Sequence, residues 1–374
     1  MKIVVVIPTY NEKENVTKLI PVLDDVFKKS DYSFSILIVD GNSPDGTHQA
    51  ALELSKKYKF VNSILEKKKN GLGAAYIYGF NYAMHELHAD IIVEMDADFQ
   101  HDPHDLPRLV KSIIDDKADY VIGSRFTKGG SIPKEWALYR KFLSIGGNIF
   151  SKIVLGIFSV NDFTTGFKAS RVKGFVDKLP LDKILSAGFA YKIDLLFKMH
   201  RLGARIKEIP IAFGIRDLGT SKMEVNNPTD SLKVVVMLRV NENKSFFKFI
   251  IVGFTGLFVD AGLFNILRLL PTLGSTTGAF ISGTLAMLTT FLLNNHWSFG
   301  DRKLKNNNDK IKGIIIYFAS SYVPILVRAK LIDLSVLWFG DTFIVTNLAF
   351  FIGIVFGLVW NFTVYSKLIW KKDK

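Results

Sequence analysis

Two aspartates separated by one residue are the most informative chemical feature of this chain. Asp96 and Asp98 directly follow the apolar run IIVEM, with Gln100 and His101 close behind. Two carboxylates at positions i and i+2 that leave a buried strand can face one cation together with a phosphate. Mg²⁺ and Mn²⁺ prefer such hard oxygen ligands. The spacing therefore predicts a site for a divalent cation and a phosphate, the alternative being a solvated acidic turn.

Basic residues farther along the chain are candidates for binding phosphate. Arg125 follows a strand pattern, and Arg140 and Ser144 are spaced i and i+4, so they share one helical face. Arg216 and Lys222 lie in FGIRDLGTSKM, a glycine-containing segment that could close over a diphosphate. Guanidinium and ammonium groups make charge-assisted bonds to phosphate oxygens. The alternative for each of these residues is a solvated surface charge.

Strand and helix patterns alternate through the part of the chain that contains these residues. The strand patterns cover 2–8, 34–40, 61–66, 89–98 and 118–124. Apolar strands with helices between them predict an α/β domain whose mostly parallel sheet is covered on both faces. Ligands bind beyond the carboxyl ends of the strands in such sheets. The polar residues that follow the strands are therefore expected to meet at one edge.

Composition and missing motifs exclude several classes of protein. The 374 residues include no cysteine, which excludes thiol catalysis, cysteine-ligated zinc and a disulfide-stapled module. A hydrophobic content of 48% is enough to form a core. No G-x-G-x-x-G follows the first strand, and no phosphate-binding G-x-x-x-x-G-K-[ST] is present. The formal charge is +13, but the basic residues of the tail flank apolar stretches and no nucleic-acid motif accompanies them, so no nucleic-acid partner is expected.

The pattern of the C-terminal part of the chain predicts a membrane domain. Its apolar stretches, 249–270, 277–293, 314–339 and 343–370, are each near the ~20 residues that a helix needs to cross a bilayer. The connection at 301–312 holds five Lys and Arg residues, so it is expected to be cytoplasmic. Four spans then place the N-terminal domain and both termini in the cytoplasm. We expect two domains, 1–240 and 241–374.

Several motifs together resemble one family. They are IPTYNE at 7–12, IVDGNSPDGT at 38–47, GLGAAYIYGF at 71–80, MDADFQHDP at 95–103 and GSRF at 123–126. This set resembles the inverting glycosyltransferases of family 2, which have a GT-A fold, and within them the polyprenyl-phosphate hexosyltransferases such as dolichyl-phosphate mannose synthases. The resemblance covers about residues 1–240. The tail resembles the GtrA-like four-span membrane family, which is often fused to these enzymes.

The resemblance implies a role for each matching residue. The nucleoside would be held by Pro8, Tyr10, Glu12, Val39 and Asp40. The diphosphate would be held by Asp96, Ala97, Asp98, Gln100, Arg216 and Lys222, with Asp98, Gln100 and Asp96 binding Mg²⁺ or Mn²⁺. The acceptor phosphate would be held by Arg125, Arg140 and Ser144, so that Asp98 and Arg125 are the expected catalytic residues.

The implied reaction transfers mannose from GDP-mannose to a polyprenyl (dolichyl) monophosphate with inversion, giving dolichyl β-D-mannosyl phosphate. The family often reads Val-Asp-Asp where this chain has Asp40-Gly41, which leaves GDP and UDP open as the nucleotide and UDP-glucose as the alternative donor. A processive polysaccharide synthase is disfavoured because no Q-x-x-R-W motif is present. The tail is expected to anchor the enzyme, or alternatively to flip the lipid-linked sugar.

The stretch 134–158 mixes aromatic, aliphatic and basic residues. It predicts one or two amphipathic helices in the membrane interface, which would bring a lipid phosphate to the site while its tail stays in the bilayer. The alternative is an ordinary amphipathic core helix. Asp162, in NDFTTGF, is a candidate helper near the acceptor.

Overall fold

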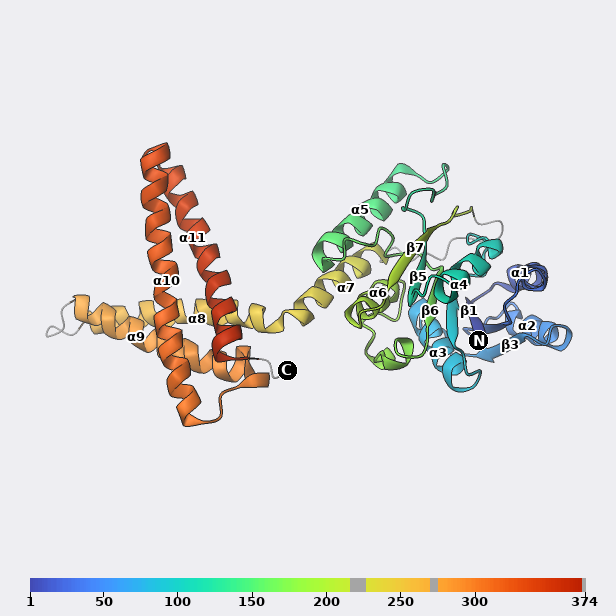
Figure 1. Cartoon of the computed structure of the whole chain (residues 1–374), viewed down its shortest axis with the longest axis horizontal. Coiled ribbons are helices and arrows are strands. Elements are labelled where there is room, and N and C mark those ends of the chain that lie inside the picture. The colour runs from blue at the N-terminus through green and yellow to red at the C-terminus, as the bar shows by residue number, and fades with distance from the viewer. Residues whose placement is uncertain (216–226, 270–274, 372–374) are drawn as a thin grey trace. The chain divides into compact units, whose positions relative to one another are not determined.

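The computed structural model describes residues 1–215, 227–269 and 275–371. Contacts within the chain divide it into two compact units, Met1–Arg239 and Val240–Lys374 (Figure 1). Each unit has its own hydrophobic clusters, and each is described separately below.

The first unit is built around a seven-stranded sheet with the strand order β3-β2-β1-β4-β6-β5-β7. The strands are β1 (Ile3–Thr9), β2 (Phe34–Asp40), β3 (Val61–Leu65), β4 (Ile91–Glu94), β5 (Tyr120–Ser124), β6 (Lys168–Arg171) and β7 (Ile206–Pro210). Strand β6 runs antiparallel to both of its neighbours, and all other pairs are parallel. The expected mostly parallel sheet is confirmed. The sequence reading did not assign β6 or β7, whose short runs mix charged and apolar residues.

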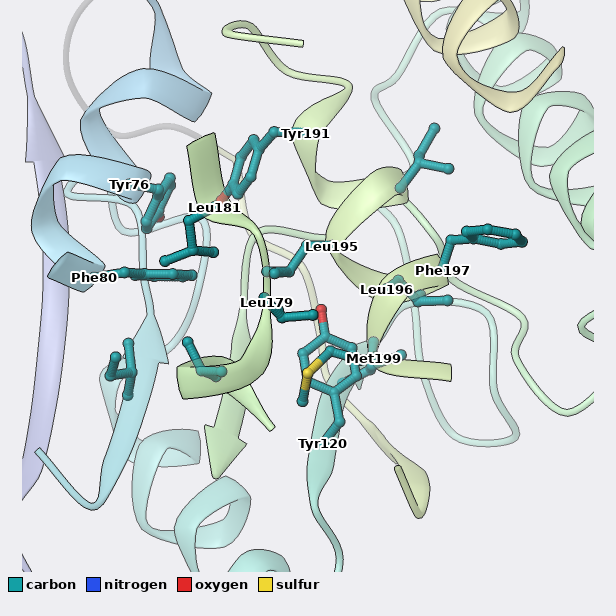
Figure 2. Packing of buried hydrophobic residues seen from close by; sticks show 14 of the residues in the cluster. Tyr76, Phe80, Tyr120, Leu179, Leu181, Tyr191, Leu195, Leu196, Phe197 and Met199 are labelled. Carbon is teal, nitrogen blue, oxygen red and sulfur yellow. The ribbon is translucent and has the colours of Figure 1, made fainter. Parts of the chain in front are cut away.

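Helices cover both faces of this sheet because successive strand residues point to opposite faces. One set of alternate β1 residues packs with α1 (Lys13–Lys28), α2 (Thr47–Lys57) and α4 (Leu106–Ile114). The other set packs with α3 (Leu72–His85) and α6 (Tyr191–Arg201), and helix α7 (Asn227–Glu242) adds residues to this second cluster (Figure 1). Figure 2 shows the second cluster, in which the rings of Tyr76 and Tyr191 stack with centroids 5.2 Å apart.

The second unit contains four helical segments that are long and apolar enough to cross a membrane. They are Lys244–Leu267, Thr277–Ser298, Asn307–Phe339 and Phe343–Ile369, so the four expected spans are confirmed. The third helix starts seven residues earlier than the apolar pattern. The side chain of Asn306 accepts a hydrogen bond from the backbone N–H of Asn308, and this cap extends the helix into the basic connection.

The spans form two helical hairpins, α8 (Lys244–Leu267) with α9 (Ser275–Leu293) and α10 (Asn307–Phe339) with α11 (Phe343–Val364) (Figure 1). A cluster of mostly aromatic side chains joins them, drawn from α8, α9, α10 and the turns that follow α9 and α11. Its buried members are Phe249, Phe291, Phe299, Tyr317, Tyr365, Ile369 and Trp370.

Candidate functional site

A cavity of about 1450 Å³ lies in the first unit beyond the carboxyl ends of β1, β4 and β5. Ten of the fourteen residues implied by the resemblance line it: Pro8, Tyr10, Glu12, Asp96, Ala97, Asp98, Gln100, Arg125, Arg140 and Ser144. They come from four separate stretches of the chain. The sheet edge therefore brings together the residues that the sequence placed after different strands, as parallel topology requires.

Asp96 and Asp98 form the wall of the cavity just past β4. The Tyr76 hydroxyl donates a hydrogen bond of 3.0 Å to Asp96 Oδ1, and the backbone N–H of Gln100 donates one of 3.1 Å to Asp98 Oδ1. Phe99, between Asp98 and Gln100, has φ of 60°, a left-handed conformation that turns the chain sharply. Both carboxylates are thus held on the same wall by packing and by backbone geometry.

This wall fits a hard divalent cation. Two carboxylates and the amide of Gln100 line the same cavity, and Gln100 uses its Nε2 to donate to the carbonyl oxygen of Gly214 at 3.2 Å. That bond leaves the amide oxygen as the available donor atom, so the set offers oxygen ligands. Within the described ranges no group of three Asp, Glu, His or Cys side chains forms a metal site. A cation here would have two carboxylates, the amide oxygen and substrate phosphates around it.

Arg125, at the end of β5, is held by a buried acid. Its Nε and Nη2 donate to the two carboxylate oxygens of Asp162, each at 2.8 Å, and Nη2 also donates to Thr164 Oγ1 at 2.7 Å. Burial alone would raise the pKa of Asp162, but the charge and hydrogen bonds of Arg125 outweigh burial and hold the pKa below its usual value. Asp162 is therefore the group that fixes the guanidinium at the cavity.

Arg140 and Ser144 lie on α5 (Leu138–Leu155) and line the cavity. The guanidinium carbon of Arg140 sits 3.9 Å from the centroid of the Trp136 ring. The same helix exposes large apolar side chains: Leu138 is 83% exposed and Phe142 is 76% exposed. A helix with a guanidinium and a hydroxyl at a cavity and exposed apolar side chains beside them has the character expected of an interfacial helix.

Val39 and Asp40, which were expected to hold the nucleoside, do not line the cavity, whose wall at this point is formed by Gly41. Val39 is fully buried in the cluster on one face of the sheet. Asp40 accepts hydrogen bonds from Thr9 Oγ1 at 2.9 Å and from Ser43 Oγ at 2.6 Å, so its carboxylate holds the turn after β2. Any role in nucleoside binding is left to their backbone or to this turn.

Arg216 and Lys222, the two residues expected to close over the diphosphate, lie outside the described residues. Their roles stay predictions.

Two residues that the sequence reading did not place in the site also line the cavity. Lys192, at the start of α6, is 2% exposed, and its Nζ lies 4.0 Å from Asp96 Oδ2. The His101 ring stacks on Phe167, and burial lowers the pKa of His101 to about 4, so the imidazole is neutral at pH 7. His101 was noted for its place behind the aspartates, whereas no local signal marks Lys192.

Comparison with known proteins places this geometry in a family. Residues 4–175 match the family described as glycosyl transferase family 2, and residues 248–370 match the GtrA/DPMS transmembrane domain. A dolichol-phosphate mannosyltransferase of Pyrococcus furiosus is 32% identical over 383 residues, which cover 99% of both chains. The chain belongs to glycosyltransferase family 2. The first unit of this family 2 glycosyltransferase has the GT-A fold, the second is a GtrA/DPMS transmembrane domain, and the protein is an integral membrane protein.

Two further relatives are similar over the first unit of this family 2 glycosyltransferase. An undecaprenyl-phosphate mannosyltransferase of Micrococcus luteus is 40% identical over 223 residues, which cover 60% of this chain and 88% of that one. Among solved structures, glucosyl-3-phosphoglycerate synthase from Mycobacterium tuberculosis, in complex with Mn²⁺, UDP and glucosyl-3-phosphoglycerate, is 17% identical with a TM-score of 0.48. That alignment covers 64% of this chain and 79% of the other.

Proposed function

We propose that this protein transfers mannose from GDP-mannose to a membrane polyprenyl monophosphate with inversion, using Mg²⁺ or Mn²⁺. The observation that carries the proposal is one cavity with two kinds of wall. One part of its wall bears Asp96, Asp98 and Gln100 at the strand ends. Another part bears Arg125 and Arg140, next to the exposed apolar side chains of α5. The first suits a nucleoside diphosphate with its cation, and the second suits a phosphate that carries a lipid. The mannosyltransferase relatives support the same assignment.

The chemistry requires no general base. A phosphate monoester has its second pKa near 6, so the lipid phosphate is already largely a dianion at pH 7. One of its oxygens forms the new bond to the anomeric carbon of the sugar while the bond from that carbon to the diphosphate breaks and the nucleoside diphosphate leaves. In-line attack inverts the configuration at the anomeric carbon. A divalent cation bound at the aspartates would supply positive charge to the leaving diphosphate.

The residues of the chain then have distinct tasks. Arg125, fixed by Asp162, and Arg140 would bind the acceptor phosphate and aim one of its oxygens, which lowers the entropic cost of the encounter. Asp98 and Asp96 would hold the diphosphate through the cation, and Lys192 would place a further positive charge beside them. Gln100 would complete the oxygen ligands. These assignments are part of the proposal.

Topology and domain roles belong to the proposal as well. Residues 1–240 would be the catalytic domain and 241–374 the membrane domain, with 134–158 in the interface. The basic connection before α10 supports a cytoplasmic position for the catalytic domain and both termini. A cysteine introduced at exposed Lys305 and another at exposed Asp341 would test this orientation. Labelling of sealed cells by a membrane-impermeant thiol reagent should reach only the second position.

The test of function is a transfer assay on the full-length protein in detergent with Mn²⁺. GDP-mannose and UDP-glucose are each offered with dolichyl or undecaprenyl phosphate, and labelled lipid is measured. We expect transfer from GDP-mannose, abolished by Asp98→Asn and retained by Asp102→Asn. Asp102 is an exposed acid on the same loop that does not line the cavity, so it is a matched control. Transfer from UDP-glucose alone would establish the alternative donor. Transfer from neither donor, with nucleotide sugar still bound, would refute the lipid-phosphate acceptor.

A further inference from the structure

The second unit contains a cavity of its own. It has a volume of about 990 Å³ and is lined by the ends of three spans. They are the start of α8, the end of the second span with its π-helical turn Asn294–Ser298, and the end of α11 with the turn Tyr365–Ile369 that follows it. This is the end of the membrane domain at which the chain enters its first span. None of its lining residues belongs to the site described above.

The cavity wall is strongly basic. Five cations line it: Lys244, Lys248, Arg302, Lys367 and Lys371. The acidic side chains in the lining are Glu242 and Asp301, so cations outnumber acids by three. Phe246, Trp297 and Phe362 supply aromatic surface to the same wall. Positive charge combined with apolar surface at the end of membrane spans suits an amphiphile with an anionic head.

A hydrogen-bonded frame holds this wall in place. Trp370 Nε1 donates to Asn295 Oδ1 at 2.9 Å, and Arg302 Nη1 donates to the Trp370 carbonyl oxygen at 3.0 Å. Lys248 Nζ donates to the carbonyl oxygen of Trp297 at 3.1 Å. The rings of Phe299 and Trp370 stack with centroids 4.6 Å apart directly behind these groups. Two of the five cations, Lys248 and Arg302, are therefore held in place by hydrogen bonds to backbone carbonyl oxygens of the same unit.

Two polar atoms at the cavity make no hydrogen bond within the described residues. Ser298 is 2% exposed and lines the cavity, and its Oγ is one of them. The other is the buried Nε of Arg302, which lies 3.8 Å from Asp301 Oδ2 as an ion pair but is not hydrogen-bonded to it. An unpaired buried donor costs free energy that a bound acceptor would recover. Both atoms are donors of the kind that bind phosphate oxygens.

We propose that this cavity binds the phosphate headgroup of an anionic membrane lipid. The headgroup would lie among the five cations, with Ser298 Oγ–H and Arg302 Nε–H donating to its oxygens, and the lipid chains would pass along Phe246 and Phe362. The site is a second lipid site, separate from the acceptor site of the transferase. Its occupation does not depend on sugar transfer, so the two proposals can fail independently.

The test measures lipid binding to the full-length protein in detergent by native mass spectrometry. The ligands are phosphatidylglycerol, undecaprenyl phosphate, phosphatidylcholine and inorganic phosphate. The test variant is Lys244→Gln/Lys367→Gln, which removes two exposed cations of the wall. The matched control is Lys303→Gln/Lys305→Gln, which makes the same charge change at two exposed lysines of the connection before α10 that do not line the cavity.

We expect phosphatidylglycerol or undecaprenyl phosphate to bind, and the test variant to weaken that binding by about tenfold or more, because each cation adds to headgroup affinity. The control should keep wild-type affinity within about twofold, since its charges lie outside the wall. Lys244→Arg/Lys367→Arg should restore binding, which separates charge from folding, and thermal unfolding without lipid checks each variant.

Three results would overturn the proposal. Equal losses in the test and control variants would mean general surface attraction. Equal binding of phosphatidylcholine would remove the requirement for an anion. Inorganic phosphate bound as tightly as the lipids would make the ligand a free anion.

Discussion

Replacing Lys192 can distinguish a structural role of this residue from a functional one. The Lys192 side chain is 2% exposed. Its Nζ lies 4.0 Å from Asp96 Oδ2 and 4.6 Å from the centroid of the ring of Phe189, which also lines the cavity. Replacing it by methionine removes the charge and keeps most of the volume. Asp96, the acid that this change would leave behind, is 29% exposed, so water can solvate its carboxylate and no fully buried unpaired charge results. We therefore expect Lys192→Met to lower activity while leaving the melting temperature unchanged or raised.

The size of the loss depends on what the ammonium contacts during the reaction. Its 4.0 Å contact with Asp96 Oδ2 exists in the free enzyme, so that contact by itself does not accelerate the reaction. Removing one preorganised positive group from beside a developing negative charge costs about 3 kcal/mol of transition-state stabilisation. That corresponds to a fall of about 100-fold in kcat/KM. If Lys192 acts on the leaving diphosphate, the fall should appear in kcat. If it only orients Asp96, the Mn²⁺ concentration needed for half-maximal activity should rise instead.

The matched control is Lys198→Met on the same helix. Lys198 does not line the cavity, and its Nζ lies 2.8 Å from the buried carboxylate of Asp194. This variant should lose about 1–3 kcal/mol of stability, since it strands a buried acid, and should keep kcat/KM. Thermal unfolding and steady-state transfer kinetics measure both effects. A Lys192→Met enzyme with wild-type kcat/KM, or one that fails only by unfolding, would refute the functional role.

Three further outcomes are expected. Asp162→Asn should lower activity and cost about 3 kcal/mol of stability by unpairing Arg125. Because the pKa of Asp162 is lowered on folding, the unfolded state binds the extra proton, and this stability is lost as pH falls through and below the ordinary Asp value of 3.8. Thermal melts from neutral to acid pH should show a larger loss of stability in the wild type than in the variant, because Asp119, whose pKa is also lowered by its arginine partners, titrates in both. Gly166→Ala would place a Cβ 2.5 Å from Lys192 Nζ and 2.9 Å from Asp96 Oδ2, so it should displace both charged groups and reduce kcat/KM by about tenfold or more in the same assay. Phe142→Asp should weaken transfer to lipid acceptor in liposomes and leave nucleotide-sugar binding by calorimetry unchanged, whereas equal losses in both would contradict an interfacial role for α5.

The sequence predicted the residues whose positions follow from a single element. Asp96 and Asp98 could be placed because a buried strand runs directly into them, and Arg140 with Ser144 because helical spacing puts them on one face. Val39 was assigned to the nucleoside by family position, and that role stays a prediction. Its side chain is buried because helices cover both faces of the sheet, so only its backbone is left to face a ligand.

Lys192 could not be found in the same way. It stands in GFAYKIDLLFK, where a lysine in a helix pattern ordinarily indicates a solvent-exposed residue. Only the packing of α6 against the strand ends brings it to Asp96, a residue 96 positions earlier in the chain. Long-range packing of this kind leaves no periodic signal, so a buried cation at a site is visible only in the folded structure.

A buried network beneath the cavity explains how Lys192 is held there. Tyr191 donates to Glu94 Oε2 at 2.5 Å, and Lys168 Nζ donates to the carbonyl oxygen of Lys192 at 3.2 Å. Burial raises the pKa of Glu94 and lowers the pKa of Lys168 to about 8, so burial disfavours the charged form of both groups. Apolar residues of the same volume would make an equally stable core, and often a more stable one. The network is therefore best understood through what it positions: it ties α6 to β4 and β6, and so fixes the ammonium of Lys192 against the carboxylate of Asp96.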